Sequence, residues 1–445
     1  MKSREIFFNY FNKFAEETNQ RIEGDINKYR KTFVILNLKD CSGRPIHNAI
    51  VHIKQKKHYF KFGSNLFMLD EFPDDERNEI YKREFKKFFN YGTLPFYWSD
   101  YEPIEGNKRR GINAEKIYRR PAPEKVLQFC RENNIEPKGH PLIWHSHLPD
   151  WLPHDREKAF WQIDRRLREI SSEYGDKIKD WDVVNESLIA PLYSEMRLPM
   201  NYPYSVIKQA EKYFTHHRLF INELTEKVWG IEFKEHLTPF YMQLEKIRNE
   251  GMQIDCIGMQ YHLFYEEKDL ERMAEQYLNP RWLFAVLDRF ADFKKPIQIS
   301  EVTVPAYAGK DVSIEKHREY LEIQAEVTRW LFRIWFSHKN VESIIWWNLI
   351  DGTAAYGNIG TYEGENHWGG GLLDNNMMPK PVYHTINDLI NREWHTDCTI
   401  NCVNGEVEFS AFYGEYEISV EQCGKKTKFD LSLTPYSAKE FFKQI

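Results

Sequence analysis

Segments with the composition of buried β-strands alternate with helical segments from about residue 58 to residue 390, and this alternation restricts the possible folds more than any other feature of the chain. Eight strand candidates occur, at residues 59–63, 89–98, 136–144, 178–186, 217–223, 255–262, 296–301 and 343–348. Helical crossovers join parallel strands, so eight strands that alternate with helices predict an α/β fold of the (β/α)8 type, the TIM barrel. A chain of 445 residues is long enough for such a barrel, which takes about 250 residues or more, and for further segments.

The two flanks of the barrel segment have a different pattern. Phenylalanines recur at helical spacing near the N-terminus, and residues 32–38 and 49–53 have strand composition. From about residue 397 short alternating segments follow at residues 406–412, 414–420 and 427–433. We therefore predict three parts: an N-terminal helix with β-strands (1–57), the (β/α)8 barrel (58–394), and the C-terminal strands (395–445) of a small accessory β-sandwich, built from both ends of the chain.

The charge of the chain argues against two classes of partner. The formal net charge is −6, which gives no electrostatic reason to expect nucleic acid or an anionic membrane as a partner. No apolar run approaches the ~18 residues of a membrane span. The N-terminus lacks the long apolar region of a signal peptide, so the protein is cytoplasmic or, if a signal has been removed, secreted or periplasmic. The sequence leaves localisation and oligomeric state open.

Six cysteines are present, and their spacing fits no zinc signature. Free buried thiols are the favoured interpretation, and one disulfide among the three C-terminal cysteines is the alternative. No cluster of histidine and acidic residues has metal-ligand spacing, so we predict no catalytic metal and no cofactor.

Two of the predicted strands end in, or just before, a glutamate. Residues 178–186 end at Glu186, and residues 296–301 end at Glu301. Barrel enzymes place their chemistry at the C-terminal ends of the strands, so these carboxyl groups are expected to meet across one pocket. Retaining glycoside hydrolysis requires such a pair, one as nucleophile and one as acid and base. From these residues alone, the assignment of the two roles stays open.

A resemblance to a known family extends this interpretation. Residues 139–149, 182–186, 258–262, 299–301 and 347–351, followed by 372–374 and 379–383, resemble in order the sequence blocks of glycoside hydrolase family 10, the β-1,4-xylanase family. The match covers roughly residues 50–390. The flanking segments are similar to those of plant and gut-bacterial members, so the chain resembles a divergent member with accessory strands.

The resemblance implies a role for each matched residue. Glu186 would be the general acid and base, and Glu301 the nucleophile. Asn185 would bind the 2-hydroxyl of the cleaved sugar, and His262 would hold the nucleophile. The remaining matched residues would line the same subsite: His140, Trp144, Gln260 and Trp347. A buried histidine or tryptophan can also be a plain core residue, and that alternative stays open for His262, Trp144 and Trp347.

The chain departs from the family where sugars are gripped. The usual Glu-Asn-x-x-Lys-Trp block of the second strand is replaced by residues 93–98, so Tyr97 occupies the position of the lysine. His147 occupies a position where glutamine is usual. These replacements exchange hydrogen-bonding groups for aromatic surface, and each lost charged hydrogen bond costs about 1.5–3 kcal/mol of binding. A glycine-rich segment, residues 364–371, either reshapes the cleft or forms a surface loop anchored by Trp368.

These observations favour a retaining glycoside hydrolase that cleaves a β-1,4-linked plant polysaccharide, namely xylan or decorated xylan. A polysaccharide or oligosaccharide is the expected partner. Two alternatives remain: a retaining hydrolase of another β-glycoside, because the sugar grip differs, and a carbohydrate-binding barrel without activity, because a fold does not prove catalysis.

Overall fold

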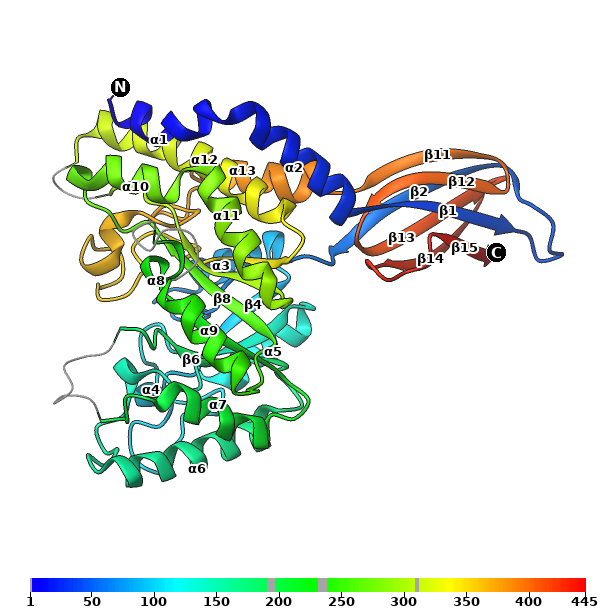
Figure 1. Ribbon diagram of the computed structural model, residues 1–445. Helices are drawn as coiled ribbons and strands as arrows, with labels where there is room; N and C mark the ends of the chain where they lie inside the picture. Colours follow the sequence, from blue (N-terminus) through cyan, green and yellow to red (C-terminus); the bar gives the residue numbers. More distant parts are fainter. Residues whose placement is uncertain (1, 190–196, 231–237, 309–311) are drawn as a thin grey trace.

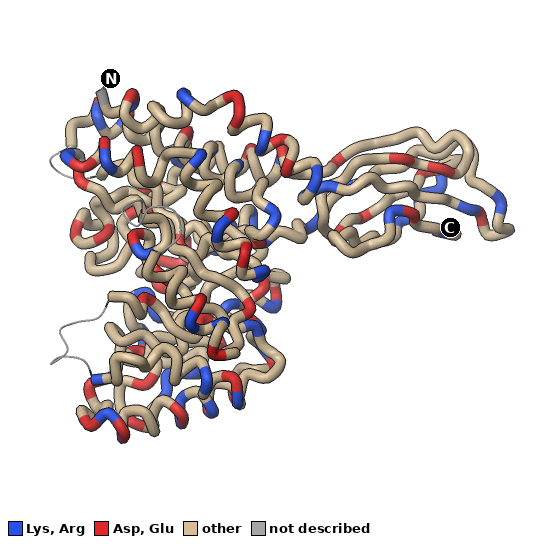
Figure 2. The backbone as a smooth tube through the Cα atoms, viewed as in Figure 1, with Lys and Arg blue, Asp and Glu red and all other residues tan. Residues whose placement is uncertain are grey.

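The computed structural model describes residues 2–189, 197–230, 238–308 and 312–445. Figure 1 shows two parts: a large α/β body and, beside it, an elongated β-structure that contains the C-terminus. Lysine and arginine are interspersed with aspartate and glutamate over both parts (Figure 2), which agrees with the small net charge. No helix among the described residues is long and apolar enough to cross a membrane.

Eight parallel strands form a closed barrel, as predicted. In chain order they are β3 (Lys61–Asn65), β4 (Tyr91–Pro95), β5 (Glu136–His140), β6 (Asp180–Asn185), β7 (Arg218–Glu223), β8 (Cys256–His262), β9 (Ile297–Thr303) and β10 (Val341–Trp346). The barrel closes between the last and the first strand, where Ile345 pairs with Gly63. Each strand candidate from the sequence corresponds to one of these strands, so the (β/α)8 prediction is confirmed.

The helices surround the barrel. They are α3 (Asp75–Phe88), α4 (Trp98–Tyr101), α5 (Pro123–Glu132), α6 (Arg156–Tyr174), α7 (Tyr202–Tyr213), α8 (Thr225–Trp229), α9 (Pro239–Asn249), α10 (Leu270–Tyr277), α11 (Pro280–Phe290), α12 (Ile314–Ser337) and α13 (Pro381–Asp388). Several of these helices are preceded by a residue whose side chain accepts a hydrogen bond from a backbone N–H group of the first turn. Asp155 accepts from the N–H of Lys158 at the start of α6, and Ser313 accepts from that of Lys316 at the start of α12.

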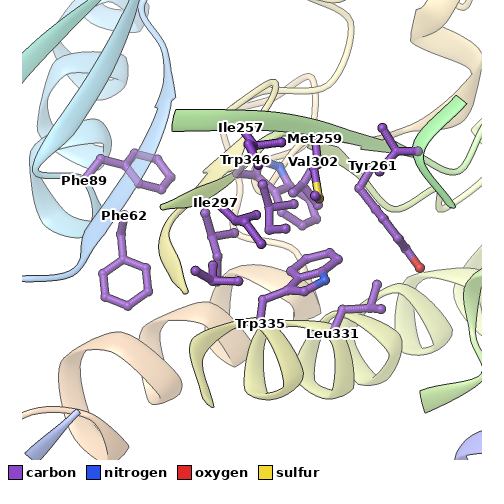
Figure 3. Close-up of a cluster of buried hydrophobic side chains, with 14 of the residues drawn as sticks. Phe62, Phe89, Ile257, Met259, Tyr261, Ile297, Val302, Leu331, Trp335 and Trp346 are labelled. Carbon is purple, nitrogen blue, oxygen red and sulfur yellow. The ribbon is translucent and has the colours of Figure 1, made fainter. Parts of the chain in front are cut away.

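The core lies between the barrel wall and the helices. Figure 3 shows Leu331 and Trp335 of α12 directed toward side chains of three adjacent strands, among them Ile257, Met259, Tyr261, Ile297, Val302 and Trp346. The rings of Tyr261 and Trp335 meet edge to face, 4.8 Å apart. A close approach occurs at β5, where a Cβ atom added to Gly139 would overlap the ring of Trp181, so this position requires glycine.

Strands from both ends of the chain form the accessory β-sandwich. These strands are β1 (Lys31–Lys39), β2 (His47–His58), β11 (Asp397–Asn404), β12 (Glu406–Phe412), β13 (Gly414–Gln422), β14 (Lys425–Leu433) and β15 (Glu440–Gln444). One sheet has the order β12-β1-β15 and the other β11-β2-β13-β14. Their facing side chains, such as Val34, Val51, Phe409 and Ile418, form a separate hydrophobic cluster. The predicted sandwich is thus confirmed, whereas the domain boundaries at 57/58 and 394/395 remain a prediction.

Two N-terminal helices, α1 (Lys2–Lys13) and α2 (Ala15–Tyr29), connect the two parts. In Figure 1 they run along the barrel past α12 toward the sandwich. Phe7, Phe8 and Phe11 are buried against the barrel helices, and Phe11 stacks on Trp330 with ring centroids 5.3 Å apart.

All six cysteines are free thiols; three are buried, Cys398 is half-buried, and Cys41 and Cys423 are exposed. The alternative of a C-terminal disulfide is therefore wrong.

Candidate active site

A pocket of about 470 Å³ opens where the barrel strands end. Every side chain predicted from the sequence to belong to the site lines it: Tyr97, His140, Trp144, His147, Asn185, Glu186, Gln260, His262, Glu301 and Trp347. A larger cavity of about 910 Å³ lies at the other end of the barrel, beside the sandwich, and contains none of these residues. The chemistry therefore belongs to the smaller pocket.

One amide group connects the two glutamates. Gln260 Nε2 donates to Glu186 Oε1 at 2.9 Å and to Glu301 Oε1 at 3.1 Å. These two carboxylate oxygens are consequently at most 6.0 Å apart, the sum of the two distances. Retaining enzymes separate their carboxyl groups by about 5–5.5 Å and inverting enzymes by about 6.5–9.5 Å. The bridge is thus compatible with the separation that retention requires.

Glu301 is surrounded by donors. Its Oε1 also accepts from Asn222 Nδ2 at 2.7 Å, and its Oε2 lies 3.2 Å from His262 Nε2. Burial lowers the pKa of His262 to about 4, so the ring is neutral at pH 7. His262 Nδ1 pairs with the Thr303 hydroxyl at 2.9 Å. With Thr303 donating to Nδ1, the Nε2–H group of the neutral ring points at the Glu301 carboxylate.

Asn222 is a functional residue that the sequence analysis did not single out. Its Nδ2 donates to Asn185 Oδ1 at 2.8 Å as well as to Glu301, and its carbonyl accepts the backbone N–H of Glu186 at 2.9 Å. It therefore fixes both halves of the site. The signal was present: Asn222-Glu223 ends β7 just as Asn185-Glu186 ends and follows β6.

The backbone directs Glu186 into the pocket. Glu186 has a φ of +49°, a left-handed conformation that is unusual for a residue other than glycine. The buried carboxylate of Glu223 holds the next two residues, accepting from the Ser187 hydroxyl at 2.7 Å and the Leu188 N–H at 3.1 Å. The chain just after β6 is thereby fixed so that the side chain of Glu186 faces Gln260.

The two glutamates have different proton affinities. Burial and then the charge of Glu301 raise the pKa of Glu186 to about 8. Burial raises the pKa of Glu301 to about 7, opposed by the positive potential of His140 and the hydrogen bond from Asn222. Donors favour the ionised form of a carboxyl group, and Glu301 has more of them than Glu186. Glu301 therefore loses its proton first, and Glu186 keeps its own.

An aromatic wall faces the carboxyl groups. Phe67, Tyr97 and Trp347 form a buried cluster against which Trp144 packs. The Tyr97 ring also lies edge to face with His147 at 4.7 Å and with His140 at 5.6 Å. Tyr97 thus contributes ring surface to this side of the pocket.

Buried charges below the pocket hold His140. Its Nδ1 lies 2.8 Å from Asp182 Oδ2, which Lys138 Nζ also contacts at 2.8 Å. The Asp182 carboxylate orients the ring, which also lies edge to face with Trp347 at 5.7 Å.

Further residues that the sequence analysis did not assign to the pocket also line it: Asp100, Tyr118, Arg119, Arg120, Leu224, Thr225, Glu226, Phe264, Ala355, Tyr356 and Glu365. Glu365 belongs to the glycine-rich segment, whose short helix η5 (Gly364–Trp368) packs Trp368 on Phe264 with ring centroids 5.4 Å apart. Both interpretations of this segment hold, because Trp368 anchors it and Glu365 reaches the pocket. Most of these side chains come from loops, which have no periodic pattern.

The match to known families decides the class of the protein. The family model described as glycosyl hydrolase family 10 matches residues 109–389, more than half of the chain. The chain belongs to glycosyl hydrolase family 10. The resemblance seen in the sequence and the enzyme class, a glycoside hydrolase of the xylanase type, are thereby confirmed.

Individual relatives are distant. Endo-1,4-beta-xylanase B of Thermotoga neapolitana is 28% identical over 351 residues, which cover 74% of this chain and 87% of the relative. Anti-sigma-I factor RsgI6 of Acetivibrio thermocellus is 24% identical over 434 residues, 94% of this chain, and the chain spans about half of that relative's length (48%). Among solved structures, xylanase 10B of Thermotoga petrophila in complex with xylobiose has a TM-score of 0.56 at 21% identity, covering 75% of this chain and 95% of that one. This last likeness concerns the fold.

Proposed function

We propose that this family 10 member hydrolyses a β-1,4-linked plant polysaccharide, xylan or decorated xylan, with retention of anomeric configuration. The Gln260 bridge carries the proposal, because it keeps the Glu186 and Glu301 oxygens within 6.0 Å, the sum of its two hydrogen bonds. The relatives include endo-1,4-beta-xylanases, which supports xylan as the substrate class.

In the first step Glu301 attacks the anomeric carbon. A bond forms between its carboxylate oxygen and C1 while the bond from C1 to the glycosidic oxygen breaks. Glu186 delivers its proton to the departing oxygen. In the second step Glu186 removes a proton from water, the water oxygen attacks C1, and Glu301 leaves as a carboxylate. The higher pKa of Glu186 supports this division of roles.

Other residues hold the substrate and the nucleophile. Asn185 Oδ1 already accepts from Asn222, so the Nδ2 group is the end that donates to the 2-hydroxyl of the sugar. His262 and Gln260 position Glu301 through their hydrogen bonds. The remaining side chains, His140, Trp144, His147, Trp347 and Tyr97, form the surface against which the sugar rings pack.

A second candidate function is hydrolysis of a different β-glycoside by the same two glutamates. The observation that favours it is the aromatic wall around Tyr97, which stands in the block that departs from the family's usual hydrogen-bonding grip. A wall of rings discriminates between sugars by shape, and it offers fewer partners to the hydroxyl groups of xylose than charged side chains do.

A substrate panel tests both candidates. The protein is incubated with xylan, other β-glucans and mannans, oligosaccharides and aryl β-glycosides, and the anomer formed first is identified by NMR. Release of β-anomeric xylo-oligosaccharides supports the main proposal. Cleavage of another glycan while xylan stays intact supports the second candidate. Full activity of Glu301→Ala refutes the mechanism, and sugar binding without turnover on any substrate indicates a binding protein.

A further inference from the structure

Two adjacent arginines face the pocket opposite the catalytic pair and have no part in the proposed mechanism. Arg119 and Arg120 belong to the loop between α4 and α5. Their guanidinium carbons lie 5.3 and 5.6 Å from the ring centroid of Phe67. That of Arg120 lies 3.6 Å from the ring centroid of Tyr97. Both cations therefore adjoin the aromatic wall described above.

The charge of Arg119 is buried without an acidic partner. Only 4% of the residue is exposed. Its Nη1 donates to Asn348 Oδ1 at 2.8 Å and to the carbonyl of Thr353, both uncharged acceptors. Nε is enclosed and has no hydrogen-bond partner. Within the described part of the chain, no carboxylate forms an ion pair with Arg119.

The neighbouring groups do not balance this charge. Arg120 Nε donates to Asp100 Oδ2 at 2.9 Å, and Arg120 Nη1 donates to the Arg119 carbonyl at 3.0 Å. Asp100 Oδ2 accepts from Arg120 and from the Ser99 hydroxyl, and no ion pair joins it to Arg119. Burial and the charge of Arg120 lower the pKa of Arg119, and the more distant Glu365 only partly opposes them. Among the described residues, Arg120 thus has a carboxylate partner and Arg119 has none.

The backbone at this position is also strained. Arg119 has a φ of +63°, in the left-handed region that favours glycine. A buried, unpaired cation and an unfavourable backbone conformation each cost free energy, and such costs concentrate at ligand-binding positions. Arg166, which is 2% exposed, also donates only to backbone carbonyls, those of Leu142 and Phe96, so it is the position of Arg119 in the wall of the pocket that marks it as a ligand-binding group.

We propose that Arg119 and Arg120 bind the carboxylate of a uronic-acid unit in the glycan that enters the active site. This inference rests on the proposed function, because it names the decoration that the same pocket accepts. The planar guanidinium group offers parallel N–H donors that match the two oxygens of a carboxylate. Nη2 of each arginine makes no hydrogen bond to the described residues and is the donor that meets the ligand. Neutral sugar hydroxyls would leave the charge of Arg119 uncompensated.

The test measures binding in an inactive background, so it does not depend on turnover. Glu301→Gln is titrated calorimetrically with xylo-oligosaccharides that carry one glucuronic acid and with unsubstituted ones of equal length. The acidic ligand should bind tighter by about tenfold or more, the gain typical of a charge-assisted hydrogen bond. Adding Arg119→Met should reduce this ratio to about one, and Arg119→Lys should retain part of it. Raising the salt concentration should weaken only the acidic ligand.

Two further variants guard against misfolding and non-specific charge effects. Arg120→Met also removes a cation from the pocket, from a residue that is less enclosed, and it should lower the same ratio. Arg392→Met removes an exposed arginine of η6 (Leu389–Glu393), ion-paired with Asp388 far from the pocket, and should leave the ratio unchanged. Equal affinity of Glu301→Gln for acidic and neutral ligands overturns the inference. Failure of the wild type to hydrolyse xylan, with the acidic preference intact, contradicts the proposed function alone.

Discussion

Replacing Glu186 by glutamine should stabilise the folded protein at neutral pH while it abolishes the proposed acid catalysis. Burial and the charge of Glu301 raise the pKa of Glu186 from 4.5 to about 8. Glutamine has nearly the same shape and cannot ionise, so the variant avoids the cost that folding imposes on this carboxyl group. Because the pKa of Glu186 is raised, the gain in stability of the variant should be larger at pH 7 than at pH 5.

The sign and size follow from proton linkage. A group whose pKa is raised on folding contributes stability that is fully present below its unfolded value of 4.5 and is lost as the pH rises through about 8. At pH 7 the unfolded chain has ionised this group and the folded protein has not. Because pH 7 lies 2.5 units above 4.5, ionisation of Glu186 in the unfolded chain lowers the free energy of unfolding by about 3 kcal/mol, at roughly 1.4 kcal/mol per unit. At pH 5 this loss in the free energy of unfolding is below about 1 kcal/mol.

Urea unfolding of the wild type and the variant at about pH 5 and pH 7 measures this difference. Glu102→Gln is the control of opposite sign, because Glu102 is a buried glutamate whose pKa is lowered. Its carboxylate accepts from the Gly106 N–H, the Trp98 indole and Arg165, all at 2.8–3.0 Å. Glu102→Gln should therefore destabilise the protein at pH 7, and its deficit should shrink as the pH falls below the unfolded pKa.

The reasoning is refuted if Glu186→Gln is no more stable than the wild type at pH 7, or if its advantage is the same at both pH values. A gain of the same size in both glutamine variants would also refute it, because the two pKa shifts have opposite directions.

Three further outcomes are expected. The kcat/KM profile should be bell-shaped, with limbs near pH 7 and pH 8 as Glu301 and then Glu186 ionise, and Glu186→Ala should lose the alkaline limb on aryl glycosides with good leaving groups. Gln260→Leu should lower kcat by roughly 10–100-fold without unfolding the protein, since both carboxyl groups lose their common donor; unchanged kcat with normal circular dichroism would contradict this. Gly139→Ala should cost about 1–3 kcal/mol in urea unfolding because its Cβ overlaps the Trp181 ring, and a neutral effect would show that the ring can move.

Much of the fold could be predicted because barrel strands are buried on both faces. β6 is buried at every position, and its buried Trp181, Val183 and Val184 are the residue types that mark the strand in sequence. The sandwich was also predictable, since β12 alternates between exposed and buried positions. β11 was not located as a separate strand, because most of its side chains are exposed and its pairing with β2 lies far away in sequence.

The sequence predicted the residues of the site only where they lie in a barrel strand or shortly after one. Glu186 directly follows β6, whereas Glu301 lies inside β9, which continues two residues beyond the predicted end to Thr303. Arg119 and Arg120 lie in an irregular loop of charged residues, where nothing local distinguishes a buried arginine from a solvated one. Their burial depends on Phe67 and Asn348, which belong to other parts of the barrel. Loop residues therefore required the three-dimensional structure.

The arrangement of the sandwich has a consequence for how the protein is made. β1 and β2 are the inner strands of their sheets, and every strand that pairs with them lies at the other end of the chain. About 340 residues separate the end of β2 at His58 from the start of β11 at Asp397. At a synthesis rate of about 5–20 residues per second, β1 and β2 leave the ribosome roughly 20–70 s before their partners exist. During that interval both edges of each strand are unpaired, so the nascent chain is exposed to aggregation until the barrel has been synthesised and the last strands arrive.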